Sequence, residues 1–248
     1  MTAAGAAGTS VEIEGTTLTW PIQVRKARIG SATFTADARA AARLLPNGIV
    51  PFTIRPGRTL VTLTMADYLD NDLGDYDEFA VAIAVREAGG PATMLRSIGA
   101  TLRGKVTTFT AYMPVDQPFT LAAGRQLWGF PKTLDDVSIG VEGDRATCTW
   151  NADGAHVVTL TVPAGTGRRI PTQELDTFTV LDGALQRTTF TMGSEQGRIG
   201  PGGAEVTLGT HPIADELRRL KLSRRAVFTT WMATMTGTFQ PPRPMRSV

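Results

Sequence analysis

Leu60–Tyr68 (LVTLTMADY) and Glu78–Arg86 (EFAVAIAVR) are the two stretches that decide the fold. Both are rich in apolar and β-branched residues, and the first alternates apolar with polar side chains, which is typical of a strand that buries one face. The segment between them contains Asp70, Asn71 and Gly74, residue types that favour turns. The two stretches therefore predict β-strands of an antiparallel sheet.

The same pattern continues along most of the chain, as short runs of Thr, Val, Ile and Phe between Gly, Pro, Asp and Asn. Further strands are predicted at Val11–Ile13, Thr16–Trp20, Ser31–Phe34, Lys105–Tyr112, Thr133–Val141, Arg145–Trp150, His156–Val162, Ala184–Thr191 and Glu205–Leu208. We therefore expect a protein with many strands.

Few segments break this pattern. Ala36–Leu45 is rich in alanine and predicts a helix, and a second helix is predicted to begin at Pro212 because apolar residues follow at helical spacing. The glycine-rich Gly197–Gly203 predicts a loop. The apolar Phe228–Met235 favours neither helix nor strand, because it is also rich in threonine.

These elements predict an α+β, mainly antiparallel β fold, with one sheet-rich sandwich or barrel and a few helices. The 248 residues are a suitable length for one large domain, and we expect a single domain over 1–248. The ends, 1–10 and 240–248, are expected to be irregular tails.

Composition excludes several classes of function. Lys and Arg total 25 against 23 Asp and Glu, so no basic excess is present for binding nucleic acid. One cysteine and two histidines are too few for zinc fingers, haem ligation or Cys/His proteases, and we expect no metal site. The longest apolar run, Phe79–Val85, is too short to cross a membrane, and no signal peptide is evident. We expect a cytoplasmic protein with no membrane partner.

Lys132 is the lysine with an unusual neighbourhood, since it follows aromatic residues in Leu127–Leu134 (LWGFPKTL). If this segment is extended, Trp128, Phe130 and Lys132 lie on the same side. An apolar environment disfavours a charged ammonium, and a neutral amine is a nucleophile toward ketones. The alternative is an ordinary lysine whose stem packs on the aromatic rings while its ammonium reaches water.

Gly124–Lys132 (GRQLWGFPK) resembles the G-R-E-x-x-G-[FY]-P-K segment of the acetoacetate decarboxylase family, in which the lysine forms a Schiff base with substrate. Asp75–Glu78 is similar to the family's Y-x-E segment, and Gly209–Pro212 to its G-x-H-P turn. Order and spacing agree from about Ile29 to Phe239. The resemblance implies a β-cone or double-barrel-like sheet around a buried lysine, and a homo-oligomer.

The resemblance also implies a carbon–carbon lyase that decarboxylates a β-keto acid through an iminium on Lys132, with Glu78 orienting the carboxylate or moving protons. No cofactor or metal is implied, and the partner is a small keto acid. Arg28, chosen over Arg25, is expected to meet the substrate carboxylate. The expected pocket wall consists of Trp128, Phe130, Tyr112 and Met113.

Three positions depart from the family pattern. Thr133 stands where many members have a second lysine, Thr64 aligns with an acidic position, and Gln126 replaces a common glutamate. Two alternatives therefore stay open: a Schiff-base aldolase-dehydratase that acts on pyruvate-like 2-keto acids, and a non-catalytic protein that binds a small acid with Lys132 as counter-ion.

Overall fold

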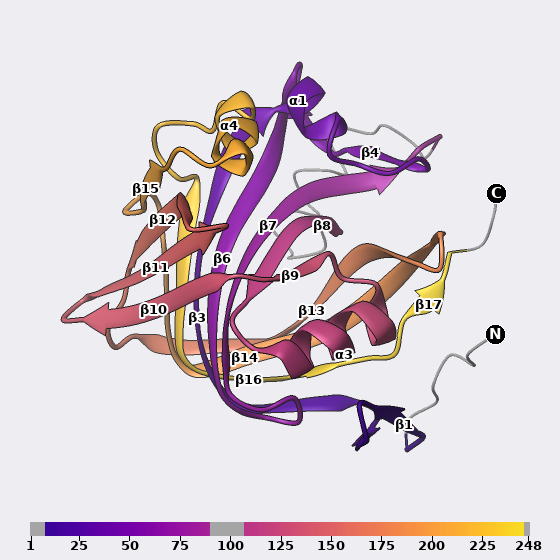
Figure 1. The fold of residues 1–248 in the computed structure, drawn as a ribbon. Coiled ribbons are helices and arrows are strands. Elements are labelled where there is room, and N and C mark those ends of the chain that lie inside the picture. The colour runs from indigo at the N-terminus through magenta and orange to yellow at the C-terminus, as the bar shows by residue number, and fades with distance from the viewer. Residues whose placement is uncertain (1–7, 90–106, 246–248) are drawn as a thin grey trace.

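The computed structural model describes residues 8–89 and 107–245, and its main feature is a strongly curved sheet whose strands close into a ring (Figure 1). Around the ring, the strands are β7 (Tyr76–Glu87), β6 (Arg58–Asn71), β3 (Ile22–Asp37), β16 (Phe228–Phe239), β14 (Ala184–Gly200), β13 (Arg168–Leu181) and β8 (Thr108–Val115). The ring closes because β8 pairs again with β7. Neighbouring strands are antiparallel except at a short parallel contact between β13 and β8.

Short strands extend this sheet. They are β4 (Ile49–Pro51) on β7, β5 (Thr53–Arg55) on β6, β17 (Arg243–Pro244) on β14, and β9 (Lys132–Leu134), which is parallel to β8. A second antiparallel sheet contains β10 (Asp136–Glu142), β11 (Arg145–Ala152), β12 (Ala155–Pro163) and β15 (Glu205–Leu208). The hairpin of β1 (Ser10–Ile13) and β2 (Thr16–Thr19) stands apart.

Three helices are described: α1 (Ala38–Ala42), α3 (Pro118–Trp128) and α4 (Pro212–Arg219). Helix α3 begins where the Gln117 side chain accepts the Thr120 N–H, and Pro118 occupies its first turn. It ends at Gly129, which has a left-handed φ of 69°. A Cβ there would lie 2.2 Å from the Val180 carbonyl oxygen, so the turn before Lys132 requires glycine. None of the described helices is long and apolar enough to span a bilayer.

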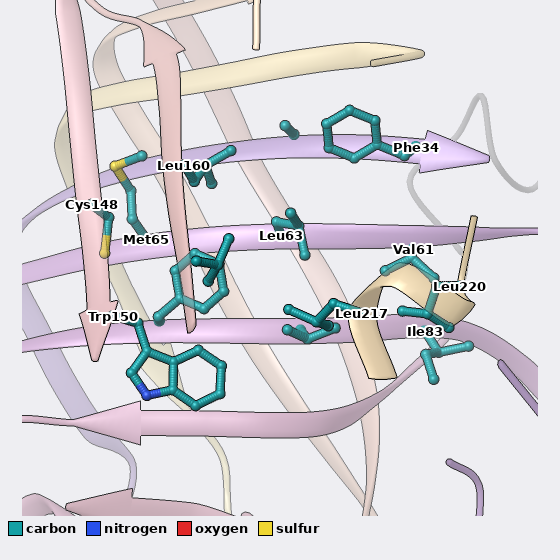
Figure 2. Close-up of a cluster of buried hydrophobic side chains, with 14 of the residues drawn as sticks. Phe34, Val61, Leu63, Met65, Ile83, Cys148, Trp150, Leu160, Leu217 and Leu220 are labelled. Carbon is teal, nitrogen blue, oxygen red and sulfur yellow. The ribbon is translucent and has the colours of Figure 1, made fainter. Parts of the chain in front are cut away.

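Successive side chains of a strand point to opposite faces of the sheet, and the buried hydrophobic residues accordingly form two clusters. One face of β6 and β7 packs against the second sheet and α4, as Figure 2 shows for Leu63, Trp150, Leu160 and Leu217. The other face contributes to a second cluster together with α3 and the β1–β2 hairpin. The division decides which side chains can meet Lys132.

The predicted fold class is confirmed, and most predicted strands are present. Phe228–Met235, left open above, belongs to strand β16. The loop prediction for Gly197–Gly203 was wrong over its first four residues, because β14 continues to Gly200. A Cβ on Gly197 would lie 2.3 Å from Ile170 Cδ1, so this glycine allows close packing inside a sheet.

The remaining differences concern the helices and the ends. The Pro212 helix is present as α4, the predicted Ala36–Leu45 helix is shorter, and α3 and β13 were not predicted. Residues 105–106 of a predicted strand, and residues 1–7 and 246–248 of the predicted tails, lie outside the described residues. Within the predicted tails, Ser10 begins β1 and Arg243–Pro244 form β17.

Candidate active site

Lys132 and Glu78 are brought together by strand β8. Glu78 on β7 is opposite Val115, while Lys132, the first residue of β9, is opposite Met113 on the other side of β8. Val115 and Met113 are two residues apart and therefore share a face. The sheet register thus places the amine and the carboxylate on one face, from strands about fifty residues apart in sequence.

Both charged groups are buried and in direct contact. Lys132 is 3% exposed and Glu78 is 7% exposed. Lys132 Nζ lies 2.9 Å from Glu78 Oε2, and it also donates a hydrogen bond of 2.8 Å to Thr120 Oγ1. Burial of an ion pair is unfavourable unless the partners compensate the lost hydration. Here the carboxylate, the hydroxyl and the face of Tyr76, whose ring centre is 4.8 Å from Nζ, provide that compensation.

Helix α3 holds the stem of Lys132. A Cβ on Gly124 would lie 2.5 Å from Lys132 Cδ and 2.7 Å from Cε, so the lysine stem lies directly against the helix at this glycine. Thr120 is one turn earlier on the same helix face. Lys132 therefore runs along α3 from Gly124 to Thr120, and Arg125 Nε donates a hydrogen bond of 2.7 Å to the Lys132 carbonyl.

Two stacked tyrosines lie beside the ion pair. The rings of Tyr68 and Tyr76 are 4.5 Å apart between centres. Burial, and secondly the negative charge of Glu78, raises the pKa of both phenols well above the usual range. Both hydroxyls are therefore protonated near neutral pH.

Three of the four predicted wall residues lie on this side of the sheet. Met113 is the ladder neighbour of Lys132, and Trp128 and Phe130 belong to the same hydrophobic cluster as Tyr76. The expected extended geometry was wrong, however, because Trp128 is the last residue of α3. Trp128 instead packs edge to face on Trp20, with 5.2 Å between ring centres.

Tyr112 is on the opposite face of β8. It packs near Trp150, and its hydroxyl donates to Glu216 of α4. Tyr112 is opposite Val81 of β7, which is three residues after Glu78 and so points to the other face of the sheet. The expectation that Tyr112 lines the Lys132 pocket does not agree with this placement.

Arg28 is also on the opposite face. In the sheet, Arg28 is opposite Asp67 on β6, and Asp67 is opposite Asp77 on β7, so these three side chains share one face. Glu78 is the next residue after Asp77, and adjacent residues of a strand point to different faces. Arg28 and Glu78 therefore lie on opposite faces of the sheet. Arg28 forms an ion pair with Asp67. The structure therefore does not bring Arg28 to the Lys132 amine, and the expectation that it meets the substrate carboxylate there needs correction.

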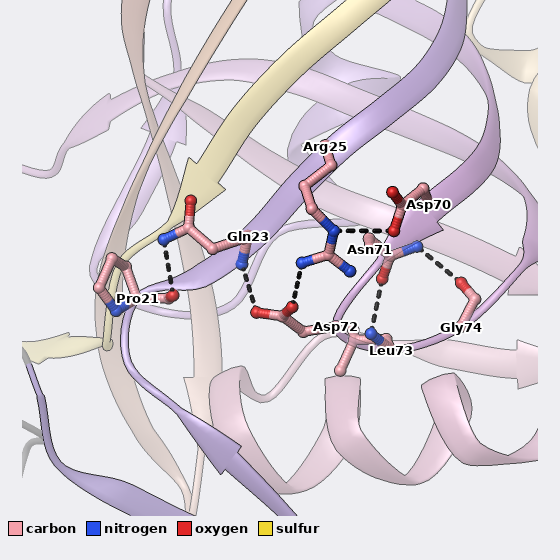
Figure 3. Close-up of polar contacts among 8 residues, drawn as sticks. All are labelled: Pro21, Gln23, Arg25, Asp70, Asn71, Asp72, Leu73 and Gly74. Atoms are coloured by element: carbon pink, nitrogen blue, oxygen red, sulfur yellow. Dashed lines mark hydrogen bonds and ion pairs between the residues drawn. The ribbon is translucent and has the colours of Figure 1, made fainter.

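Arg25, the other N-terminal candidate, is at the surface. It forms ion pairs with Asp70, near the end of β6, and with Asp72 of the turn between β6 and β7. Figure 3 shows these contacts together with the Asn71 hydrogen bonds that close the turn. Arg25 is half exposed and serves this turn. Within residues 8–89 and 107–245, no group of three or more His, Cys, Asp or Glu side chains is arranged to hold a metal ion.

Asp77 is the most perturbed carboxyl group of the Arg28 face. Its burial, and secondly the charge of Asp67, raises its pKa to about 7. Asp77 Oδ2 accepts the Ile139 N–H of β10 at 2.8 Å, which links the ring to the second sheet. Burial also raises the pKa of the nearby Cys148 thiol, so this cysteine is a core residue and a poor nucleophile.

Sequence reasoning missed Thr120 and Gly124 as members of the site. Both depend on helix α3, whose signals are Pro118 near its start and Gly129 just past its end. With the helix recognised, their spacing of four residues places them on one face, directed at the residue that follows the turn. The helix ends were therefore the signal that would have found them.

Fold and site together define a mainly β protein built around a buried lysine–glutamate pair. The family model for acetoacetate decarboxylase (ADC) matches residues 14–241, and the chain belongs to this family. The resemblance of the Gly124–Lys132 segment is thereby confirmed at the level of family. No curated protein matches the chain significantly by sequence.

Solved structures share the fold at low sequence identity. The acetoacetate decarboxylase of Legionella pneumophila has a TM-score of 0.69 and 18% identity, with 91% of this chain and 87% of that chain covered. The enduracididine biosynthesis enzyme MppR was solved with the condensation product of pyruvate and imidazole 4-carboxaldehyde. It has a TM-score of 0.61 and 16% identity, with 92% of this chain and 90% of that chain covered. An acetoacetate decarboxylase-like enzyme from Sphingomonas wittichii has a TM-score of 0.53 and 16% identity, with 90% of this chain and 93% of that chain covered. Family membership indicates an enzyme that acts on a small molecule.

Proposed function

We propose that this protein is a Schiff-base lyase that decarboxylates a small β-keto acid at Lys132. The observation that carries the proposal is the buried contact between Lys132 Nζ and Glu78 Oε2, at 2.9 Å. A proton can pass directly from the ammonium to the carboxylate over this distance, which produces a neutral amine in an apolar compartment. Such an amine is a nucleophile toward a ketone carbon.

The reaction conserves atoms and charge without a cofactor. The amine electron pair forms a C–N bond to the ketone carbon, and the oxygen leaves as water after it takes up the proton held by Glu78 and a second proton from nitrogen. The iminium that remains accepts the electron pair of the breaking C–C bond as carbon dioxide departs. Protonation of the enamine at carbon and hydrolysis by water then release the ketone and regenerate Lys132.

The surroundings of the pair favour decarboxylation. In the described residues, Glu78 is the charged side chain in contact with Lys132, and the tyrosines and Met113 around the pair form an apolar wall. A substrate carboxylate in this compartment has lost its hydration and lies near a second carboxylate. Loss of neutral carbon dioxide removes both the unfavourable burial of the substrate carboxylate and its repulsion by Glu78, so the site stabilises the transition state relative to the bound acid.

A second candidate keeps the Schiff base and changes the subsequent step to aldol condensation and dehydration of a pyruvate-like 2-keto acid. The position of Thr64 favours it, because Thr64 is opposite Ala80 and so shares the face of Glu78, yet has no charge. MppR, with a similar fold, was solved with a pyruvate condensation product. The same experiment separates the two candidates.

The test is reductive trapping with acetoacetate and borohydride, and separately with pyruvate and borohydride, followed by intact and peptide mass spectrometry. Borohydride converts an iminium into a stable secondary amine. For the decarboxylase, acetoacetate is expected to leave a propan-2-yl group on Lys132, without the carboxylate. An adduct that retains the carboxylate from acetoacetate, together with labelling by pyruvate, supports the second candidate.

The matched controls are Lys132→Arg and Lys26→Arg. A guanidinium is not usefully deprotonated, so Lys132→Arg is expected to abolish labelling, whereas exchange of the exposed Lys26 is expected to change nothing. Because a buried arginine can disturb folding, Lys132→Met is measured in parallel, and circular dichroism checks both variants. Absence of any adduct on the folded native protein would overturn the proposal and favour simple binding of a small acid.

A further inference from the structure

The Lys132 amine has an uncharged partner that the proposed chemistry has not yet used. Thr120 has no exposed surface, and its Oγ1 accepts a hydrogen bond from Lys132 Nζ at 2.8 Å, as close as the contact with Glu78. The ring of Tyr76 lies under the same Nζ. Three side chains thus surround one nitrogen, and Glu78 is the charged one among them.

Thr120 and Glu78 respond differently when the proton moves. Glu78 accepts a hydrogen bond while it is ionised and becomes a donor once it has taken the proton. A threonine hydroxyl accepts an N–H from an ammonium and from a neutral amine alike. The Thr120 contact therefore persists through deprotonation of Lys132, and it fixes the rotation of the amine at the moment when its electron pair is needed.

The Tyr76 ring lies on another side of the amine. Its centre is 4.8 Å from Nζ, where the ring face favours a cation such as the iminium. Gly124, one turn further along α3, leaves room for the lysine stem to reach this position.

We propose that Thr120 is a positioning residue that orients the Lys132 amine for attack on the ketone. This inference rests on the proposed Schiff-base function, since it concerns the same nitrogen. It adds a residue outside the Lys132 and Glu78 segments, and it assigns helix α3 a direct part in the chemistry.

The experiment measures the rate at which acetoacetate with cyanoborohydride labels Lys132 in the full chain. Thr120→Val has nearly the same shape but lacks the hydroxyl, and it is expected to slow labelling about 10- to 100-fold, the effect of losing a hydrogen bond to a charged group. Thr120→Ser retains the hydroxyl and is expected to recover most of the native rate. A merely structural role would not predict rescue by serine together with loss in valine.

Thr229→Val is the matched control, because it removes another buried threonine hydroxyl, which bonds to the Gly200 carbonyl on β14. It is expected to label at the native rate. Urea unfolding of every variant separates a loss of stability from a loss of rate. A Thr120→Val protein that is folded and labels as fast as the native protein overturns the inference, while the Schiff-base function stands.

If neither acetoacetate nor pyruvate labels the native protein, the proposed function itself fails, and the inference fails with it.

Discussion

Gly124 shows how the absence of one methyl group leaves room for the Lys132 side chain. The Lys132 stem occupies the space that a Cβ at this position would need, at 2.5 Å from Cδ and 2.7 Å from Cε. Lys132 Nζ forms an ion pair with Glu78 and a hydrogen bond with Thr120, so the Lys132 side chain cannot move aside without breaking one of these contacts. The glycine of the family motif therefore has a packing function in this chain.

We predict that Gly124→Ala slows reductive labelling of Lys132 at least about 10-fold, since a shift of roughly 1 Å in a reacting group is costly. The helix itself is expected to tolerate alanine well, because alanine is the better helix former. Labelling rate and thermal unfolding, measured side by side, check both statements.

Gly140→Ala is the matched control for this change. Gly140 lies in strand β10 with no atom within 4 Å of its would-be Cβ, so alanine there is expected to leave labelling unchanged. Native labelling in Gly124→Ala would show that the amine does not need its present position.

At the scale of elements, β7 presents neighbouring carboxylates to opposite faces of one sheet. Glu78 meets Lys132, while Asp77 faces Asp67, Arg28 and the Ile139 N–H of β10. Burial and the charge of Asp67 raise the pKa of Asp77 to about 7 from the usual 3.8. The protonated form of Asp77 is therefore favoured by folding, and its contribution to stability is present below about pH 4 and is lost as pH rises through 7.

We predict that Asp77→Asn becomes progressively more stable, relative to the native protein, as pH rises from 5 to 8. Asparagine retains an oxygen that accepts the Ile139 N–H and carries no charge that burial opposes. Urea unfolding at several pH values measures the difference. A difference that is independent of pH over this range would contradict the raised pKa of Asp77.

Asp75→Asn provides the comparison, because Asp75 is an exposed carboxylate in the turn just before β7. Its replacement is expected to give a small difference in stability that does not follow pH in the same way. The two asparagine variants together separate the effect of the buried position from the effect of removing one negative charge.

Strands were predictable from sequence where one face is buried, as in Leu60–Tyr68 within β6. Strand β13 was not predicted because most of its first half is exposed and polar, so neither face shows alternation. Helix α3 was missed because its apolar residues continue into the aromatic segment, which has the pattern of a strand. The amine and carboxylate could be predicted from their motif, but Thr120 depended on the missed helix.

At the scale of the whole molecule, the larger hydrophobic cluster and the proposed active site lie in different parts of the core. The large cluster between ring and second sheet contains Trp150, Leu160 and Ile83, and it lies on the face opposite Lys132. The cluster on the Lys132 side is smaller, and the buried Lys132–Glu78 ion pair lies beside it. Changes in the first cluster should therefore affect unfolding without affecting the amine.

We predict that Leu160→Ala lowers the free energy of unfolding by about 2–5 kcal/mol, the usual cost of a cavity at a fully buried leucine, and leaves the labelling rate of folded protein unchanged. Denaturant unfolding and labelling under native conditions measure the two quantities. Ile199→Ala serves as control, because Ile199 is 54% exposed and its loss is expected to cost little. Slower labelling in folded Leu160→Ala would show that the two clusters are coupled.

The ring of strands joins the beginning of the chain to its end, since β3 (Ile22–Asp37) is hydrogen-bonded to β16 (Phe228–Phe239). On the ribosome, β3 therefore emerges long before its partner and has a free edge until residue 239 has left the exit tunnel. Contacts this distant in sequence make folding slow, and an open edge is a template for pairing with other chains. Closure of the ring therefore has to wait until residue 239 is available, and until then the free edge of β3 is open to pairing with other chains.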